Sequence, residues 1–220
     1  ETISELIEKN GGTLVVNAGV KCIKIHNGKS VGVEMDNGDT IEAKNTISSI
    51  GVVNTLNKLL SSDSVNKAKH DDCLKTIQST ESYVCLHLGL KNSIKNLGIK
   101  NTNLWIYQGY DHDTLVQNYI DNPKSDFPIV YVSFPSEKDD EWTKNNPDQS
   151  TVEAITLSRW DWYKSWEHMK WKKRGMEYEN HKLELSERIL KVVKEQVKGI
   201  EGYIDCQELS TPLTVRDLAN

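Results

Sequence analysis

Two Asn-Gly pairs, at residues 27–28 and 37–38, constrain the fold of this chain more than any other feature. Asn-Gly is the preferred pair in two-residue β-hairpin turns, because such turns need a positive φ at both residues. Apolar side chains alternate with polar or small ones over residues 31–35, and β-rich segments at 20–26 and 40–43 flank the two turns. The pattern predicts a three-stranded antiparallel meander.

Helical and extended segments surround the meander. Apolar residues at helical spacing precede the glycines at 11–12, which predicts a helix that ends there. A second helix is expected over residues 52–60, where leucines and valines recur at helical intervals. Short strands are expected at residues 13–16 and 45–51, where β-branched residues gather.

The remainder of the chain alternates between β-rich runs and helical patterns. Helices are expected over residues 113–120 and 176–198, and the apolar positions of the longer helix share one face. The polar segment 135–148 is bounded by prolines, which predicts a surface loop. Strands of a mixed sheet are expected at residues 82–90, 103–107, 129–134 and 151–158, with one more strand at 203–209. The expected fold class is α/β (α+β): a β-meander followed by a mixed-sheet domain with flanking helices.

Composition excludes several classes of protein. The formal net charge of −5 argues against nucleic-acid binding, which requires a surplus of basic residues. The longest apolar runs last only a few residues, whereas a membrane-spanning helix needs about 20. The four cysteines form no Cys-x-x-Cys pair. This spacing argues against a zinc site. The ordinary number of cysteines and the apolar neighbours of Cys85 favour reduced thiols, so a cytoplasmic location is expected, with a location peripheral to a membrane as the alternative.

No sequence motif identifies catalytic chemistry. A nucleophile elbow, a P-loop and a His-Glu-x-x-His motif are absent from the sequence, and no residue is predicted to be catalytic or to bind a metal. The triplets of histidine and aspartate at 70–72 and 111–113 are expected to be solvated surface. His87, between two leucines of a predicted strand, is expected to be a hydrogen-bonded histidine of the sheet, with a catalytic base as the alternative.

Aromatic and basic residues concentrate in the segment Trp160–Arg174. Trp162, Trp166 and Met169 have the spacing of one helical face, which predicts a helix that packs its aromatic side inward. The alternative is a peripheral membrane contact, because tryptophan together with lysine is typical of segments at a lipid surface. This alternative predicts binding to anionic liposomes that weakens when Trp166 and Lys172 are replaced.

The order of these elements resembles the middle of FAD-dependent oxidoreductases of the phytoene desaturase, carotenoid isomerase and retinol saturase family. The resemblance is carried by residues 6–12, 17–23, 32–34, 37–38, 47–51, 198–200 and 209–214. The blocks before residue 52 are shared with the wider amine-oxidase-like flavoprotein group, and the last two narrow the resemblance to this family. The family's Gly-x-Gly-x-x-Gly motif, which holds the FAD pyrophosphate at a helix N-terminus, does not occur in these 220 residues.

The resemblance implies roles for a few residues before position 52. Val20 would hold the adenine ring of FAD through its backbone, and Ser49 and Gly51, with Ser48, would form a corner of small residues near the cofactor. The sequence without the resemblance is equally consistent with another interpretation, in which Val20 is an ordinary core residue of the meander. Because the main phosphate-binding motif is missing, the 220 residues by themselves are expected to bind FAD negligibly and to be inactive.

The resemblance also implies a domain division and a substrate class. Residues 1–70 are expected to be part of an FAD-binding domain, 71–213 a substrate-binding domain, and 214–220 the start of the return to the FAD-binding domain of a longer enzyme. That enzyme would move a hydride between flavin and a lipophilic isoprenoid or polyene substrate, in a cavity shaped by the strands of 82–158 and the aromatic segment. Two alternatives without redox activity are a stand-alone hydrophobic-ligand binding module and a protein-interaction domain that uses the tryptophan-rich surface.

Overall fold

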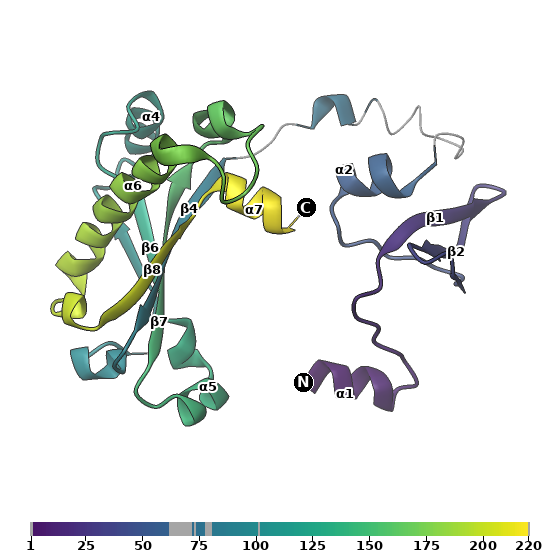
Figure 1. The fold of residues 1–220 in the computed structure, drawn as a ribbon, viewed down its shortest axis with the longest axis horizontal. Helices are drawn as coiled ribbons and strands as arrows, with labels where there is room; N and C mark the ends of the chain where they lie inside the picture. The colour runs from purple at the N-terminus through teal and green to yellow at the C-terminus, as the bar shows by residue number, and fades with distance from the viewer. Residues whose placement is uncertain (1, 62–71, 73, 78–80, 101, 220) are drawn as a thin grey trace. The chain divides into compact units, whose positions relative to one another are not determined.

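The chain consists of two compact units, residues 1–79 and 80–220, called here the N-terminal and the C-terminal unit. The computed structural model describes residues 2–61, 72, 74–77, 81–100 and 102–219 (Figure 1). Each unit has its own antiparallel sheet, with three strands in the N-terminal unit and five in the C-terminal unit.

The N-terminal unit contains the meander that the Asn-Gly pairs predict. Strands β1 (Val20–His26), β2 (Lys29–Met35) and β3 (Thr40–Glu42) pair antiparallel in the order β1-β2-β3. Asn27 has a φ of 49° and Gly28 a φ of 73°, as a two-residue hairpin turn requires. Helix α1 (Thr2–Lys9) precedes the sheet and ends before the glycines at 11–12, as expected.

Gly32 lies in the middle of β2, where glycine would normally weaken a strand. Its φ of 143° and its contact with β3 explain the residue, because a Cβ atom there would collide with the carbonyl oxygen of Ile41. The close approach of the two backbones therefore requires glycine at this position.

Two expected strands of the N-terminal unit, 13–16 and 45–51, are not strands in the structure. Both segments are extended or irregular, and neither pairs with another strand of the described residues. Their residues favour β-structure, but no adjacent strand pairs with them. A β-strand needs an adjacent strand because its backbone N–H and C=O groups form hydrogen bonds only with that strand. The helix expected over 52–60 is present in a shorter form, as α2 (Val52–Asn54) continued by one π-helical segment, η1 (Thr55–Leu59).

The C-terminal unit is built on a five-stranded sheet in the order β5-β6-β7-β4-β8. Its strands are β4 (Ser82–Leu90), β5 (Leu104–Tyr107), β6 (Ile129–Ser133), β7 (Ser150–Ser158) and β8 (Ile204–Ser210). The fold class is confirmed, but all neighbours pair antiparallel, so the sheet itself is not mixed. The long helix α6 (Gly175–Gln196) connects β7 to β8 along the chain. These two strands run in the same direction, because β4 lies between them and pairs antiparallel with both.

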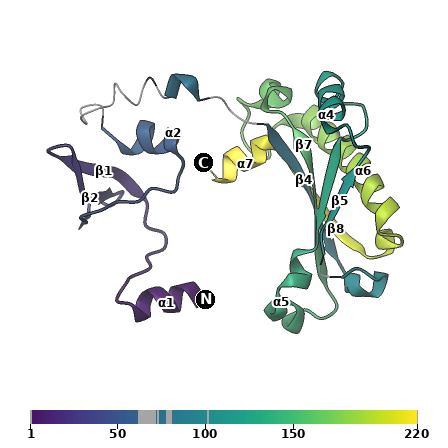
Figure 2. The ribbon, with the colours of Figure 1, turned by 180° about the vertical axis from the view of Figure 1, so that it is seen from behind.

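Helix α6 (Gly175–Gln196) lies along one side of this sheet, whereas α5 (Asp140–Asn145) and α7 (Pro212–Ala219) lie toward the other side in both views (Figures 1 and 2). The shorter helical segments of the unit are η2 (Ile94–Leu97), α4 (His112–Asp121), η3 (Pro135–Lys138), η4 (Trp160–Trp166) and η5 (Ile200–Gly202). The helix predicted over 113–120 is therefore confirmed as α4.

The segment 135–148 is more ordered than the predicted surface loop. Pro135 begins η3, and the side chain of Asp139 caps α5 by accepting a hydrogen bond from the backbone N–H of Trp142 at 2.9 Å. Glu137 is buried, and its carboxylate accepts a hydrogen bond from the Ser150 hydroxyl at 2.7 Å. Pro135 and Asp139 of this segment therefore start helical segments, and Glu137 anchors the segment to β7.

Alternate residues of β4 form the centre of the core. Val84, Leu86, Leu88 and Leu90 are buried, and the buried face of α6 belongs to the same cluster. The residues of α6 in this cluster are Tyr178, Leu185, Ile189 and Val193. The one-sided apolar pattern predicted for this helix is therefore confirmed.

The tryptophan-rich segment packs mostly inward, as its spacing predicts, although it forms the 3₁₀ segment η4 and turns instead of an α-helix. Trp166 is 9% exposed and contacts other aromatic rings, and Trp162 and Met169 pack partly against the core. Trp171 is 46% exposed, beside Lys172. Any contact of this segment with lipid would therefore use Trp171 and not Trp166. Among the described residues, no helix has the length and apolar character needed to span a membrane.

His181 of α6 packs against the rings of Tyr163 and Trp166, which together with Tyr178 are called here the aromatic cluster. Its ring lies 5.5 Å from those of Trp166 and Tyr163, and its Nε2 atom is buried without a hydrogen-bond partner. Burial lowers the pKa of His181, Arg188 lowers it further, and Glu184 opposes the shift. The folded state therefore favours the neutral imidazole.

We expect the C-terminal unit to lose stability as the pH falls from about pH 7 to about pH 5. An unfolded histidine has a pKa of about 6.5, so below it the unfolded state binds a proton that buried His181 resists. The stability is fully present above that pKa and declines below it, by at most about 1.4 kcal/mol per pH unit for one group. Urea unfolding at several pH values should show a shallower decline for His181→Phe than for His168→Phe, a change at an exposed position. Equal slopes would contradict the assignment to His181.

Candidate functional site

The face of the five-stranded sheet opposite the buried leucines carries exposed aromatic side chains. Side chains alternate along a strand, so the neighbours of the buried residues point to this second face, called here the open face. Tyr83 is 59% exposed, Trp105 60% and Tyr107 44%. Large apolar rings left accessible on one sheet face mark a surface suited to binding an apolar ligand.

One row of the open face crosses all five strands. The register pairs Trp105 with Tyr131, Tyr131 with Ile155, Ile155 with Cys85, and Cys85 with Ser210. The Trp105 and Tyr131 rings lie 4.6 Å apart. Strands are spaced by about 4.8 Å, so the row extends over about 19 Å. We call it the apolar row, although it ends at a hydroxyl group on β8.

A polar row lies next to the apolar row. It contains Ser133, Glu153, His87 and Glu208, each the register partner of the next. His87 Nε2 lies 3.1 Å from the Ser210 Oγ, and His87 Nδ1 lies 3.5 Å from a carboxylate oxygen of Glu153. His87 is thus a hydrogen-bonded histidine of the sheet face, as expected, and it connects the polar row to the end of the apolar row.

Cys85 is the sulfur-containing member of the apolar row. Burial raises the pKa of its thiol to about 12, and the charge of Glu153 acts in the same direction. The thiol is therefore protonated at neutral pH, although its sulfur lies 3.8 Å from His87 Nδ1. A neutral thiol contributes an apolar contact and not a nucleophile.

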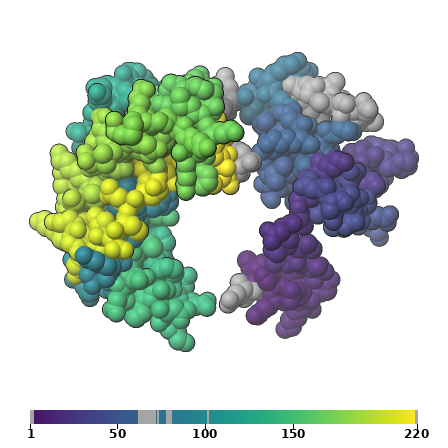
Figure 3. Space-filling view, in the orientation of Figure 1, coloured from purple at the N-terminus to yellow at the C-terminus, as the bar shows by residue number. Residues whose placement is uncertain are grey.

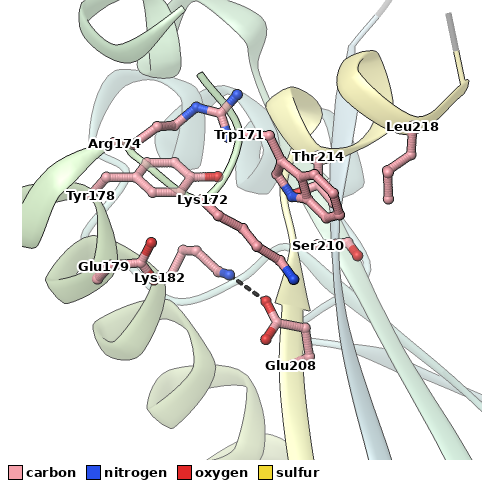
Figure 4. Close-up of a pocket in the computed structure, with 10 residues that line it drawn as sticks. All are labelled: Trp171, Lys172, Arg174, Tyr178, Glu179, Lys182, Glu208, Ser210, Thr214 and Leu218. Carbon is pink, nitrogen blue, oxygen red and sulfur yellow. Dashed lines mark hydrogen bonds and ion pairs between the residues drawn. The ribbon is translucent and has the colours of Figure 1, made fainter. Parts of the chain in front are cut away.

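A hollow of about 390 Å³ adjoins the β8 end of the open face, between α6, β8 and α7 (Figure 4). Ser210 and Glu208 border it, and Lys182 of α6 makes an ion pair with Glu208 across it. The hydroxyl groups of Tyr178 and Thr211 are hydrogen-bonded at 2.7 Å. Three cationic side chains, Lys172, Arg174 and Lys182, and two acidic ones, Glu179 and Glu208, line the hollow.

Val20, Ser49 and Gly51 lie in the N-terminal unit. Val20 is 39% exposed and begins β1, next to a hollow of about 460 Å³ lined by residues 15–19 and 35–37 among others. Gly51 precedes α2 with a φ of 88° and has open space where a side chain would project. The strand that Val20 begins contacts the helical segment η1, which follows Gly51. The hollow and the unobstructed glycine are two features of this unit that leave room for part of a nucleotide cofactor.

The triplet at 111–113 has a structural role. Asp111 caps α4 by accepting a hydrogen bond from the backbone N–H of Thr114. Hydrogen bonding to the Thr114 side chain, and then to its backbone, lowers the pKa of the Asp111 carboxyl group. His112 stacks on Tyr107 with the ring centroids 4.5 Å apart. Of the triplet at 70–72, residues 70 and 71 lie outside the described residues. In the described part of the chain, no group of three or more histidine, cysteine or acidic side chains is placed to hold a metal ion.

No sequence motif identifies Trp105, Tyr131 or Ser210 as site residues. The sequence predicts a ligand cavity shaped by the strands of 82–158 and by the aromatic segment, but Trp166 of that segment packs in the core. The signal that was available is the alternation of Tyr83, Cys85 and His87 with buried residues of β4, which marks a second face.

Comparison with known proteins identifies relatives over nearly the whole chain. No family model matches it. The chain is 30% identical, over 98% of its length, to an inactive all-trans-retinol 13,14-reductase of Danio rerio, and 29% identical, over 95%, to an all-trans-retinol 13,14-reductase of the same fish. It is 26% identical, over 98%, to the chloroplastic prolycopene isomerase of Daucus carota. The chain is a relative of the retinol 13,14-reductases and prolycopene isomerases. The resemblance inferred from the motif order is thus confirmed.

These relatives are much longer than the chain, which covers 37%, 36% and 32% of their respective lengths. A solved structure of an oxidoreductase from Methanosarcina mazei aligns with 95% of the chain, at a TM-score of 0.57 and 16% identity, and the chain covers 40% of it. This structural likeness confirms the fold.

Proposed function

We propose that the chain is the central part of an FAD-dependent oxidoreductase of the phytoene desaturase type, which acts on a lipophilic isoprenoid or polyene. Residues 1–70 would belong to its FAD-binding domain, 71–213 to its substrate-binding domain, and 214–220 to the return toward the FAD-binding domain. The observation that carries the proposal is the apolar row of the open face, in a chain whose relatives are named for retinol and prolycopene.

The open face suits an extended conjugated molecule. A row of about 19 Å offers the flat rings of Trp105 and Tyr131 at one end and Ile155 and Cys85 further along. Aromatic and aliphatic side chains bind such a molecule by excluding water and by stacking against its π system. In this proposal the sheet binds and orients the substrate and contributes no nucleophile.

The cofactor would be held at one end by the N-terminal unit. The hollow beside Val20 and the unobstructed Gly51 support a site in which the Val20 backbone binds the adenine ring and Ser49 lies nearby. When bound, the flavin supplies the hydride chemistry. The phosphate-binding motif does not occur in these 220 residues, so we expect them alone to bind FAD negligibly.

Flavin content tests the proposal directly. The complete gene product should purify with stoichiometric flavin, seen by its absorbance, and should convert all-trans-retinol or prolycopene to a product separable by chromatography. Val20→Ala keeps the backbone N–H and should retain flavin, whereas Val20→Pro removes the N–H at the first position of a strand and should weaken flavin binding by about tenfold. Thermal unfolding should be similar for both variants. A complete protein free of flavin would overturn the proposal, and equal flavin affinity of the two variants would exclude the backbone contact.

The open face also favours a second function, a hydrophobic-ligand binding module without redox activity. An accessible apolar row binds a lipophilic molecule whether or not a flavin is nearby. Lipid that copurifies with the complete protein in the absence of flavin would support this function.

A further inference from the structure

Two contacts of His87 join the polar row to the end of the apolar row. His87 Nδ1 lies 3.5 Å from a carboxylate oxygen of Glu153, and His87 Nε2 lies 3.1 Å from the Ser210 Oγ. We infer that Glu153, His87 and Ser210 form a proton relay, which gives a proton to one carbon of a polyene on the open face and takes it back in the reverse reaction. The inference deepens the proposed function and rests on it, because it takes a polyene as the ligand of this face.

Reduction of a carbon–carbon double bond requires a proton as well as a hydride, and the bound flavin supplies the hydride. As the π bond breaks, one carbon takes the hydride and its neighbour takes the proton of the Ser210 hydroxyl group. The Ser210 oxygen takes a proton in turn from Nε2 of the His87 imidazolium, so two C–H bonds form and one N–H bond breaks. His87 is left as the neutral imidazole with its remaining proton on Nδ1, beside Glu153, and a proton from solvent replaces the one that it has lost.

The surroundings of the three side chains suit a relay between solvent and a bound ligand. The His87 and Glu153 side chains are 43% and 40% exposed, and both border a hollow of about 350 Å³ beside the polar row, so water reaches the ring. Ser210 ends the apolar row, where a ligand would exclude water. The three residues lie on neighbouring strands of one sheet, and such rigid elements hold the distances that proton transfer needs.

Charged groups also lie on the other side of Ser210, around the hollow of about 390 Å³ (Figure 4). Among the described residues, His87 is the one side chain that hydrogen-bonds with Ser210. Arg174 and Lys182 border this hollow, but both are held in ion pairs with carboxylates, and an arginine keeps its protons at neutral pH. Carboxylates have no proton to give, which excludes the acids of the hollow, Glu179 and Glu208.

Two alternative proton donors remain near the relay, Lys172 and Cys85. The Lys172 ammonium group borders the same hollow, but it lies over the Trp171 ring, 4.7 Å from the ring centre. Cys85 lies opposite Ser210 in the apolar row, and its sulfur is 3.8 Å from His87 Nδ1. Burial raises the pKa of this thiol to about 12, so it gives up a proton less readily than an imidazolium does. Variants at both positions therefore belong in the test.

Contact between the relay and a polyene is tested in the oxidised complete gene product, where no reduction takes place. Its histidines are labelled with nitrogen-15 for magnetic resonance, and His87→Gln identifies the His87 signals by their loss. At mildly alkaline pH we expect the ring proton on Nδ1 in the unmodified protein and on Nε2 in Glu153→Gln, whose amide donates to Nδ1. All-trans-retinol, whose binding is followed by quenching of tryptophan emission, should shift the His87 signals and leave those of exposed His168 unchanged.

Proton transfer itself is tested by mixing the chemically reduced complete protein with all-trans-retinol and following the return of oxidised flavin by its absorbance. His87→Gln and Ser210→Ala should slow this reaction by about a hundredfold, the lower end of what a general acid contributes, without weakening retinol binding. Ser210→Thr keeps a hydroxyl group and should keep most of the rate. His168→Gln, the same change at an exposed histidine outside the sheet, is the control and should react like the unmodified protein.

The possible results separate the relay from the proposed function. If no polyene binds, the relay and the proposed substrate class are both wrong. Retinol that binds without shifting the His87 signals, that is bound but not reduced, or that reacts with His87→Gln at an unaltered rate would overturn the relay and leave polyene binding intact. A loss of rate in Lys172→Met or Cys85→Ala but not in His87→Gln would assign the proton to one of those side chains and also overturn the relay. Unfolding midpoints of His87→Gln and Ser210→Ala close to that of the unmodified protein would tie a lost rate to the relay and not to a damaged sheet.

Discussion

Trp166→Ala is expected to lower the free energy of unfolding of the C-terminal unit by about 3–5 kcal/mol, the range measured when a large buried aromatic residue is truncated. Trp166 is 9% exposed, and its ring lies 5.5 Å from both Tyr178 and His181. Alanine would remove these contacts and leave a cavity in the aromatic cluster that joins η4 to α6. Urea unfolding followed by far-ultraviolet circular dichroism avoids the loss of the tryptophan signal itself.

Trp171→Ala is the matched control, from the same tryptophan-rich segment. Trp171 is 46% exposed, and the Lys172 ammonium lies over its ring, so its removal should change the free energy of unfolding by about 0.5 kcal/mol or less. The same variant tests membrane contact, because Trp171 is the accessible tryptophan next to lysines. Similar destabilisation by the two variants would contradict the inward packing of Trp166.

Asp217→Asn is expected to destabilise the C-terminal unit by about 3 kcal/mol. Asp217 of α7 pairs with Arg174, whose side chain is only 1% exposed and has no other ion-pair partner among the described residues. Burial tends to raise the pKa of Asp217, but hydrogen bonds from Arg174 and Arg216 more than offset that effect and lower it. Removing the carboxylate leaves a buried guanidinium group without its counter-ion, which costs more than the ion pair itself contributes.

Asp161→Asn provides the same chemical change in an exposed ion pair. The Asp161 Oδ1 and Lys164 Nζ atoms lie 2.6 Å apart, and the two side chains are 56% and 62% exposed, respectively. Solvent and salt screen such a pair, so the denaturant midpoint should be unchanged. Arg174→Met combined with Asp217→Asn should recover much of the stability lost in Asp217→Asn. A destabilisation that the second change does not relieve would show that the effect does not arise from the unpaired charge.

Features that depend on local chemistry were predictable from the sequence. Asn27 and Gly28 favour a two-residue hairpin turn because both residues adopt a positive φ. The spacing of Leu185, Ile189 and Val193 indicates a helix with one buried face. The expected strand at 13–16 failed because β-forming residues do not create the partner strand that a ladder needs.

The candidate site was only partly predictable, for the same physical reason. The alternation along β4 indicates that His87 and Cys85 share a face, but their neighbours depend on which strands lie beside β4. Ser210 reaches His87 from 123 positions away, through a strand order that local spacing does not encode. The tryptophan-rich segment was expected to shape the ligand cavity because its composition is unusual, whereas its rings mainly fill the core.

The position of β4 between β7 and β8 also determines when the candidate site can form during folding. β4 comes first along the chain of the C-terminal unit and β8 last, so the contact between His87 and Ser210 closes a loop of more than half the protein. Contacts of such long range form late and slow the folding of a domain. Partly folded chains can already contain the hairpin-like pairs β5-β6 and β6-β7. The hydroxyl end of the apolar row is completed only when β8 joins the edge of the sheet. The last part of the chain, which includes β8, is visible in yellow in the space-filling view (Figure 3). Capture of a ligand by this face would therefore report complete folding of the unit.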